Sequence, residues 1–135
     1  MDITYSTTTA GVNWDKLTAD LEADDFSNGR TPDELRRSFE NSAVVVFARD
    51  GERIVGKARA LSDGVCNAYV VDVWTHSDYR RRGIATRMME LLADELAGQH
   101  IYLFTDDQEI FYRSLGYRRQ GIGMSMVIGR WLNRL

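Results

Sequence analysis

Along the first third of the chain, the apolar positions change from a strand-like to a helix-like pattern. Residues 3–9 are rich in β-branched side chains, which favour an extended backbone, and predict a first strand. A helix is predicted over residues 14–23, where the apolar positions share one helical face and Asn13 can cap the N-terminus. A second helix is predicted over residues 32–40, because Thr31 is a suitable cap before the proline at its first position.

The middle of the chain has the pattern of an antiparallel meander. Two strongly apolar runs, residues 43–48 and 53–60, flank the dipeptide Asp50-Gly51, which is a strong hairpin signal. A second turn then leads into a third β-prone run, residues 65–75. These runs predict three neighbouring strands joined by short turns.

The remaining pattern predicts a crossover and a C-terminal strand region. A helix is expected over residues 83–97, a short buried strand over 101–105 and a short helix over 107–115. Because strand–helix–strand crossovers join parallel strands, the strand at 101–105 should pair in parallel with the strand at 65–75. Residues 117–128 predict one or two further strands. The whole pattern predicts an α/β (α+β) sandwich, in which helices pack on a mixed sheet.

Length and composition narrow the classes of protein. With 135 residues, 44% of them hydrophobic and 27% charged, the chain predicts one soluble domain over residues 1–135. Its net charge of −3 disfavours general nucleic-acid binding. The apolar run at 43–48 is too short to cross a membrane, and no signal peptide is evident. A single cysteine suits a reducing compartment, so we expect a cytoplasmic protein with no membrane partner.

A basic turn before the predicted helix at 83–97 is the strongest chemical signal. Three arginines and a glycine, Arg80 to Gly83, stand between a strand and the helix start. The first N–H groups of a helix have no intrahelical partner, and the helix dipole places partial positive charge there. A glycine lets the backbone approach an anion closely. This segment predicts a site for a polyphosphate cofactor; its simpler interpretation is a helix start with solvated arginines.

Three motifs occur in the order that one enzyme family shows. Residues 80–85, Arg-Arg-Arg-Gly-Ile-Ala, fit that family's pyrophosphate signature, and the strand at 70–75 fits its central strand. Residues 111–117, Phe-Tyr-Arg-Ser-Leu-Gly-Tyr, match its aromatic segment around a tyrosine. The chain thus resembles the GNAT-type N-acetyltransferases, which move an acetyl group from acetyl-CoA to an amine. The motifs cover residues 68–117, and the order of elements agrees over nearly the whole chain.

The resemblance implies a more detailed fold and a function. The sheet should have six to seven strands, mostly antiparallel, with a central parallel pair that splays apart, flanked by about four helices. Acetyl-CoA would be the cosubstrate, without a metal, and a primary amine would attack it directly in a ternary complex. The amine should belong to a small molecule, because 135 residues leave little surface for protein recognition. The alternative is a non-catalytic acyl-CoA-binding or sensing module, and a homodimer through the C-terminal strand and Trp131–Leu132 is possible.

The resemblance also implies which residues contact the cofactor. Backbone groups of the central strand would polarise the thioester carbonyl and bind the pantetheine arm, and the basic turn would hold the pyrophosphate. Thr105 stands where the family often has an asparagine that touches this arm. The predicted cofactor-binding residues are Val73, Trp74, Thr75, Arg80, Arg81, Arg82, Gly83, Ile84, Ala85, Thr86, Thr105 and Tyr112.

Tyr112 and Asp72 are the predicted catalytic residues. A phenol is still protonated at neutral pH, so Tyr112 can protonate the leaving thiolate, as its family counterpart does. Asp72 interrupts an apolar strand, and burial would raise the pKa of its carboxyl and make it a suitable base. Asp72 could instead face solvent or pair with Arg59 on the adjacent strand. His76 and Asp106 are weaker candidates for the base.

Overall fold

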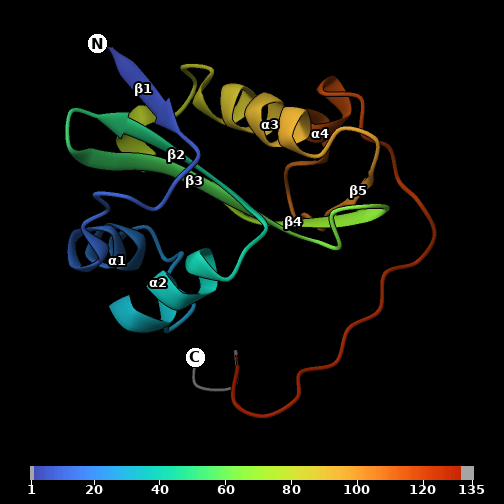
Figure 1. Ribbon diagram of the computed structural model, residues 1–135, viewed down its shortest axis with the longest axis horizontal. Coiled ribbons are helices and arrows are strands. Elements are labelled where there is room, and N and C mark those ends of the chain that lie inside the picture. The colour runs from blue at the N-terminus through green and yellow to red at the C-terminus, as the bar shows by residue number, and fades with distance from the viewer. Residues whose placement is uncertain (1, 132–135) are drawn as a thin grey trace.

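A computed structural model describes residues 2–131 and shows a mixed sheet with helices on both faces (Figure 1). The strands, in their order across the sheet, are β1 (Ile3–Ser6), β2 (Val44–Asp50), β3 (Arg53–Ser62), β4 (Asn67–Thr75) and β5 (His100–Tyr102). The helices are α1 (Trp14–Ala23), α2 (Pro32–Glu40), α3 (Ile84–Glu95) and α4 (Glu109–Ser114), and a 3-10 turn, η1 (Ser77–Tyr79), precedes α3. All neighbouring strands are antiparallel except β4 and β5, which are parallel. The predicted α/β sandwich is confirmed.

The local signals of the first two helices act as expected. The side chain of Asn13 accepts a hydrogen bond from the backbone N–H of Lys16 at the start of α1. Thr31 and Glu34 form a reciprocal capping box at the start of α2, with proline in its first turn. Gly51, with φ of +62°, forms the predicted turn between β2 and β3. No helix within residues 2–131 has the length and apolar character to span a membrane.

Two cores hold the helical layers on the sheet. Figure 1 shows α1 and α2 on one face, and α3 and α4 on the other. The core under α1 and α2 consists of Leu17, Leu21, Leu35, Phe39, Val45, Phe47, Ile54 and Trp74. The core under α3 consists of Val46, Ala48, Val55, Ala58, Ala60, Ala68, Val70, Ile84, Met88, Met89, Leu92 and Leu96.

Helix α3 approaches the sheet most closely over Gly56 of β3. A Cβ atom at this position would lie 3.0 Å from Met88 Sδ and 3.1 Å from both Ala48 Cβ and Ile84 Cγ2. Nine in ten real Cβ contacts are longer, so a side chain here would require Met88, Ala48 or Ile84 to shift by a few tenths of an ångström. The missing side chain therefore allows the first turns of α3 to lie directly on β3.

Strand β4 carries a bulge at Asp72. Arg59 pairs with Val71 and Lys57 pairs with Trp74, so one intervening residue of β3 faces two residues of β4. Asp72 has φ of +63°, which is uncommon for a non-glycine residue.

The bulge corrects the expected facing of the β4 side chains. Regular alternation would put Val70, Asp72 and Trp74 on one face. In the structure Val70 belongs to the core under α3, whereas Trp74 belongs to the core under α1 and α2. The extra residue shifts the alternation by one position, and Asp72 shares the face of Trp74.

The prediction of strands at 117–128 is wrong, and the sheet has five strands rather than six or seven. The segment has alternating apolar side chains, but alternation produces a strand only where an edge is available for pairing. β5 is only three residues long, and Gly123 lies against the ring of Phe104 beyond its end. The chain then runs outside the sheet towards α2 (Figure 1). Leu132, part of the predicted dimer contact, lies outside the described residues.

Candidate active site

Strands β4 and β5 separate part of the way along β4. Their pairing runs from Asn67 with His100 to Tyr69 with Tyr102, whereas β4 continues to Thr75. The later part of β4, including the predicted oxyanion-binding backbone at 73–75, therefore has no partner strand on its β5 side. The predicted parallel pair is confirmed, and its pairing stops at Tyr102, where β5 ends. Thr75 Oγ1 is also the one buried side-chain polar atom without a hydrogen-bond partner among residues 2–131.

The basic turn lies beside the end of β4. Arg80 Nε donates to the backbone oxygen of Thr75 at 3.2 Å, which ties the turn to the strand. Arg81 and Gly83 have φ of +64° and +77°, and among residues 2–131 no side chain caps the N-terminus of α3. The first backbone N–H groups of α3 therefore remain available to an anion, and the arginines of the turn are exposed beside them.

Tyr112 lies on α4, half-buried between the rings of Phe111 and Tyr117. Burial raises the pKa of its hydroxyl above the ordinary value of 10.0, and the neighbouring Tyr117 raises it further. The phenol is therefore protonated at neutral pH, as a proton donor must be. Tyr112 and Val73 both pack against the core under α3.

Two further predicted residues, Thr105 and His76, already accept hydrogen bonds from nearby backbone N–H groups. Thr105 is exposed, and its hydroxyl accepts from the backbone N–H of Gln108 before α4. His76 is buried; its Nδ1 accepts from the Asp78 N–H, and its Nε2 lies 3.0 Å from Arg53 Nη2. Both ring nitrogens thus face donors within the protein. Asp106 is exposed in the loop after β5.

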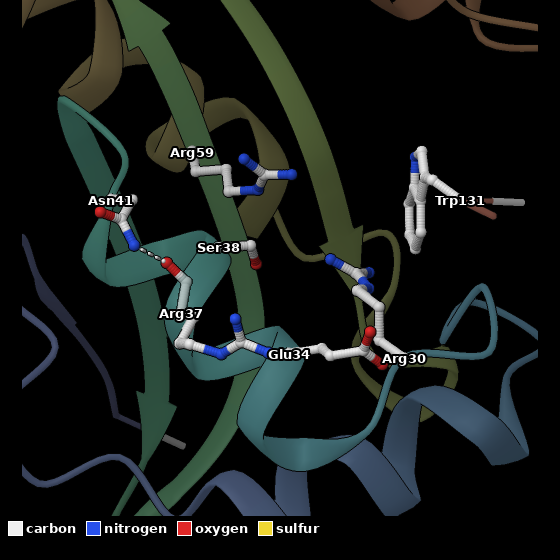
Figure 2. A pocket seen from close by; sticks show the side chains of 7 residues that line it. All are labelled: Arg30, Glu34, Arg37, Ser38, Asn41, Arg59 and Trp131. Atoms are coloured by element: carbon white, nitrogen blue, oxygen red, sulfur yellow. Dashed lines mark hydrogen bonds between the residues drawn. The ribbon is translucent and has the colours of Figure 1, made fainter. Parts of the chain in front are cut away.

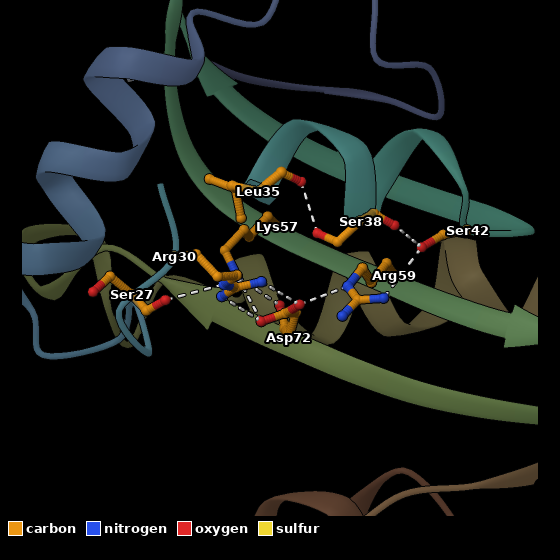
Figure 3. Close-up of polar contacts among 8 residues, drawn as sticks. All are labelled: Ser27, Arg30, Leu35, Ser38, Ser42, Lys57, Arg59 and Asp72. Carbon is orange, nitrogen blue, oxygen red and sulfur yellow. Dashed lines mark hydrogen bonds and ion pairs between the residues drawn. The ribbon is translucent and has the colours of Figure 1, made fainter. Parts of the chain in front are cut away.

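The environment of Asp72 corrects its expected chemistry. Arg30 donates to both carboxylate oxygens at 2.8 and 2.9 Å, Arg59 donates at 2.6 Å, and Lys57 Nζ lies 3.3 Å away (Figure 3). Burial alone would raise the pKa of this carboxyl, but the three neighbouring cations hold it far below its usual range. A carboxylate that binds protons so weakly is a poor base at neutral pH. The expected raised pKa is wrong, and the alternative pairing with Arg59 is confirmed.

The sequence analysis missed the partners of Asp72 other than Arg59. Lys57 is fully buried beneath the rings of Phe26 and Phe39, and burial lowers its pKa to about 8. Lys57 and Arg59 stand two apart in an apolar strand, a spacing that puts both cations on one face and could have revealed the cluster. Arg30 follows a turn and gave no such signal.

The described residues contain no group of three or more histidine, cysteine, aspartate or glutamate side chains arranged to hold a metal ion. Beside the end of β4 and the turn before α3, the described residues offer uncapped backbone groups, arginines and tyrosine hydroxyls.

Known proteins share this arrangement. Residues 40–119 match the model of the acetyltransferase (GNAT) domain. Serotonin N-acetyltransferase 2 of rice (Oryza sativa subsp. japonica), a chloroplastic protein, is 34% identical over 96 residues, which are 65% of this chain and 48% of the relative. The curated relatives are longer proteins, and the matches cover between 31% and 58% of their lengths.

Solved structures agree over more of the chain. A protein of Deinococcus radiodurans R1 described as an acetyltransferase is 30% identical, with a TM-score of 0.81 over 98% of this chain and 92% of that one. A Clostridium acetobutylicum protein solved with acetyl-CoA shares the fold at 19% identity, with a TM-score of 0.70 over 93% and 96% of the two chains. By its domain match and by this structural likeness, the chain belongs to the GNAT acetyltransferase family.

Proposed function

We propose that this protein transfers an acetyl group from acetyl-CoA to the primary amine of a small molecule. The observation that carries the proposal is the uncapped, basic N-terminus of α3 beside a β4 edge that has lost its partner strand. The site suits acetyl-CoA because the turn offers N–H groups to a pyrophosphate and Thr75 has a buried hydroxyl without a partner. Acetyl-CoA, when bound, supplies an activated acetyl group and a thiol leaving group.

The residues of the chain have separate tasks in this proposal. Backbone N–H groups near Val73 to Thr75 stabilise the negative charge that develops on the carbonyl oxygen. Tyr112 gives its proton to the departing sulfur, and its raised pKa keeps that proton in place beforehand. The ammonium group of the acceptor loses its proton to water rather than to Asp72, because three cations keep that carboxylate ionised.

The second candidate is a non-catalytic acyl-CoA-binding or sensing module. The environment of Asp72 favours this module, because the lowered pKa of the carboxyl makes Asp72 a poor general base. A cytoplasmic location and a homodimer remain predictions for either function, and a small-molecule acceptor remains one for the enzyme.

Amine-dependent release of CoA thiol is the result expected of an enzyme. Acetyl-CoA binding is measured first by calorimetry, and thiol release is then followed over a panel of small primary amines. Saturable binding with thiol release above the amine-free rate supports acetyl transfer. Saturable binding without amine-dependent release on any amine supports the sensing module, and absence of binding contradicts both.

Gly83→Ala is expected to weaken acetyl-CoA binding about tenfold or more, because distortion of the turn misplaces N–H groups that point at the pyrophosphate. Gly98→Ala is the matched control at the other end of α3. Both glycines have positive φ and nothing within 4 Å of an added Cβ, so each substitution should cost about 1 kcal/mol of stability through the backbone alone. Calorimetry and denaturant unfolding measure the two effects. Equal affinity in both variants would place the pyrophosphate elsewhere.

A further inference from the structure

A pocket of about 370 Å³ opens on the face of the sheet opposite α3. Figure 2 shows side chains from α2 and β3 on one side of it and Trp131, from the C-terminal segment, on the other. Arg30 lies under the Trp131 ring, with its guanidinium carbon 5.8 Å from the ring centroid. The pocket is lined by Arg30, Glu34, Arg37, Ser38, Asn41, Arg59 and Trp131.

The charges behind this pocket do not balance. Arg30, Lys57 and Arg59 are 4%, 0% and 13% exposed in their side chains, and within residues 2–131 the one carboxylate paired with them is that of Asp72. Buried charges are costly unless they are paired. Glu34 at the rim, and an aspartate paired with Arg37, still leave the cations in excess. In a chain of net charge −3, this is a local reversal of sign.

Two arginines still have hydrogen-bond donors to offer. Arg59 uses Nε for Asp72 and Nη1 for Ser42, and its Nη2 has no partner among residues 2–131. Arg37 uses Nε for Asp33, and both of its terminal nitrogens are without hydrogen-bond partners in the described part of the chain. Guanidinium groups with free N–H donors match the planar oxygens of carboxylates and the oxygens of phosphates.

The pocket is also near the proposed reaction centre. Arg30 and Arg59 both bind Asp72, the residue directly before the β4 backbone at 73–75. At about 3.3 Å per strand residue, the backbone at 73–75 lies within about 10 Å of Asp72, and the side chains of Arg30 and Arg59 extend from Asp72 to the pocket. A short molecule can therefore reach from one to the other, with its amine beside the β4 backbone at 73–75 and its other end in the pocket.

We infer that the acceptor amine carries an anionic group, a carboxylate or a phosphate, which binds between Arg37 and Arg59. This inference rests on the proposed acetyl transfer and adds the chemical class of its acceptor. The anion supplies the negative charge that the buried cluster lacks, and the free donors of the two arginines bind its oxygens.

Matched pairs of amines test the class. γ-Aminobutyrate is compared with butylamine for the carboxylate, and O-phosphoethanolamine with ethanolamine for the phosphate. We expect kcat/KM for at least one anionic member to exceed that of its neutral partner about tenfold or more, since charge-assisted hydrogen bonds strengthen binding. The better pair identifies which anion fits.

Arg37→Gln should remove most of this preference by raising KM for the anionic amine, with little effect on the neutral one. Arg36→Gln is the matched control: Arg36 is the neighbour on α2, pairs with Asp33 and Glu40, and does not line the pocket. Calorimetric titration of both proteins with the two anionic amines, in the absence of acetyl-CoA, gives a second readout that needs no turnover.

The outcomes separate this inference from the proposed function. Thiol release from neutral and anionic amines at equal efficiency overturns the anionic acceptor and leaves acetyl transfer standing. Saturable binding of an anionic amine that is lost only in Arg37→Gln, without thiol release, supports the pocket and contradicts acetyl transfer. The inference is overturned if the protein shows neither a kcat/KM preference for an anionic amine nor binding of one. It is also overturned if the Arg36 and Arg37 variants lose that preference or binding equally.

Discussion

Tyr112→Phe is expected to lower kcat for acetyl transfer about a hundredfold or more, the usual contribution of a positioned proton donor. The substitution removes the hydroxyl that protonates the leaving sulfur but keeps the ring, which packs between Phe111 and Tyr117. Acetyl-CoA affinity should be nearly unchanged, because we propose that the turn before α3, and not Tyr112, holds the pyrophosphate. Single-turnover thiol release and calorimetric binding measure the two effects separately.

Tyr117→Phe is the control that the structure offers. Tyr117 is also half-buried, and burial raises the pKa of its hydroxyl in the same way. A loss of turnover in Tyr112→Phe alone assigns the proton transfer to Tyr112. Similar losses in both variants would instead mean that the aromatic cluster matters only through its packing, and unchanged turnover in Tyr112→Phe would remove the residue from the mechanism.

Asp72→Asn should cost about 3–5 kcal/mol of unfolding free energy, the range seen when one partner of a buried ion pair is removed. The amide keeps the shape of the side chain but leaves Arg30, Lys57 and Arg59 without a counter-charge. Denaturant unfolding at neutral pH measures the loss. Asp33→Asn is the control, because Asp33 also binds two arginines but does so on the exposed surface of α2, where solvent screens the charges.

The pH dependence of stability is a second measure of the contribution of Asp72. The folded pKa of the Asp72 carboxyl lies below its unfolded value, so its contribution is fully present above about pH 4 and is lost as the pH falls towards the folded pKa. The wild-type protein should therefore lose stability in acid more steeply than Asp72→Asn. A variant that keeps wild-type stability but loses turnover would restore Asp72 as a catalytic base.

Local signals explain why much of the fold could be predicted from the sequence. The signals at Asn13, Thr31 and Gly51 involve only residues that are close in the chain. Each of the three forms the cap or turn expected of it. The basic turn at 80–83 was also recognisable, because its function depends on consecutive backbone groups at a helix start.

Features that depend on distant partners were not predictable in the same way. The bulge at Asp72 is a property of how β4 pairs with β3, and it reverses the facing of side chains that simple alternation implies. The low pKa of the Asp72 carboxyl depends on Arg30, which is 42 residues away in the chain. The strand pattern at 117–128 was present in the sequence, but the edge strand β5 offers only three residues for pairing.

The close approach of α3 to β3 over Gly56 has a consequence for the cofactor site. Met88 and Ile84 of α3 lie against Gly56, and the lack of a side chain there allows the uncapped start of α3 to lie close to the sheet. The arginines of the turn are exposed, whereas Gly56 is buried in β3. Gly56 would not touch the cofactor, yet a side chain there would have to be accommodated by the α3 residues that carry the row of backbone donors.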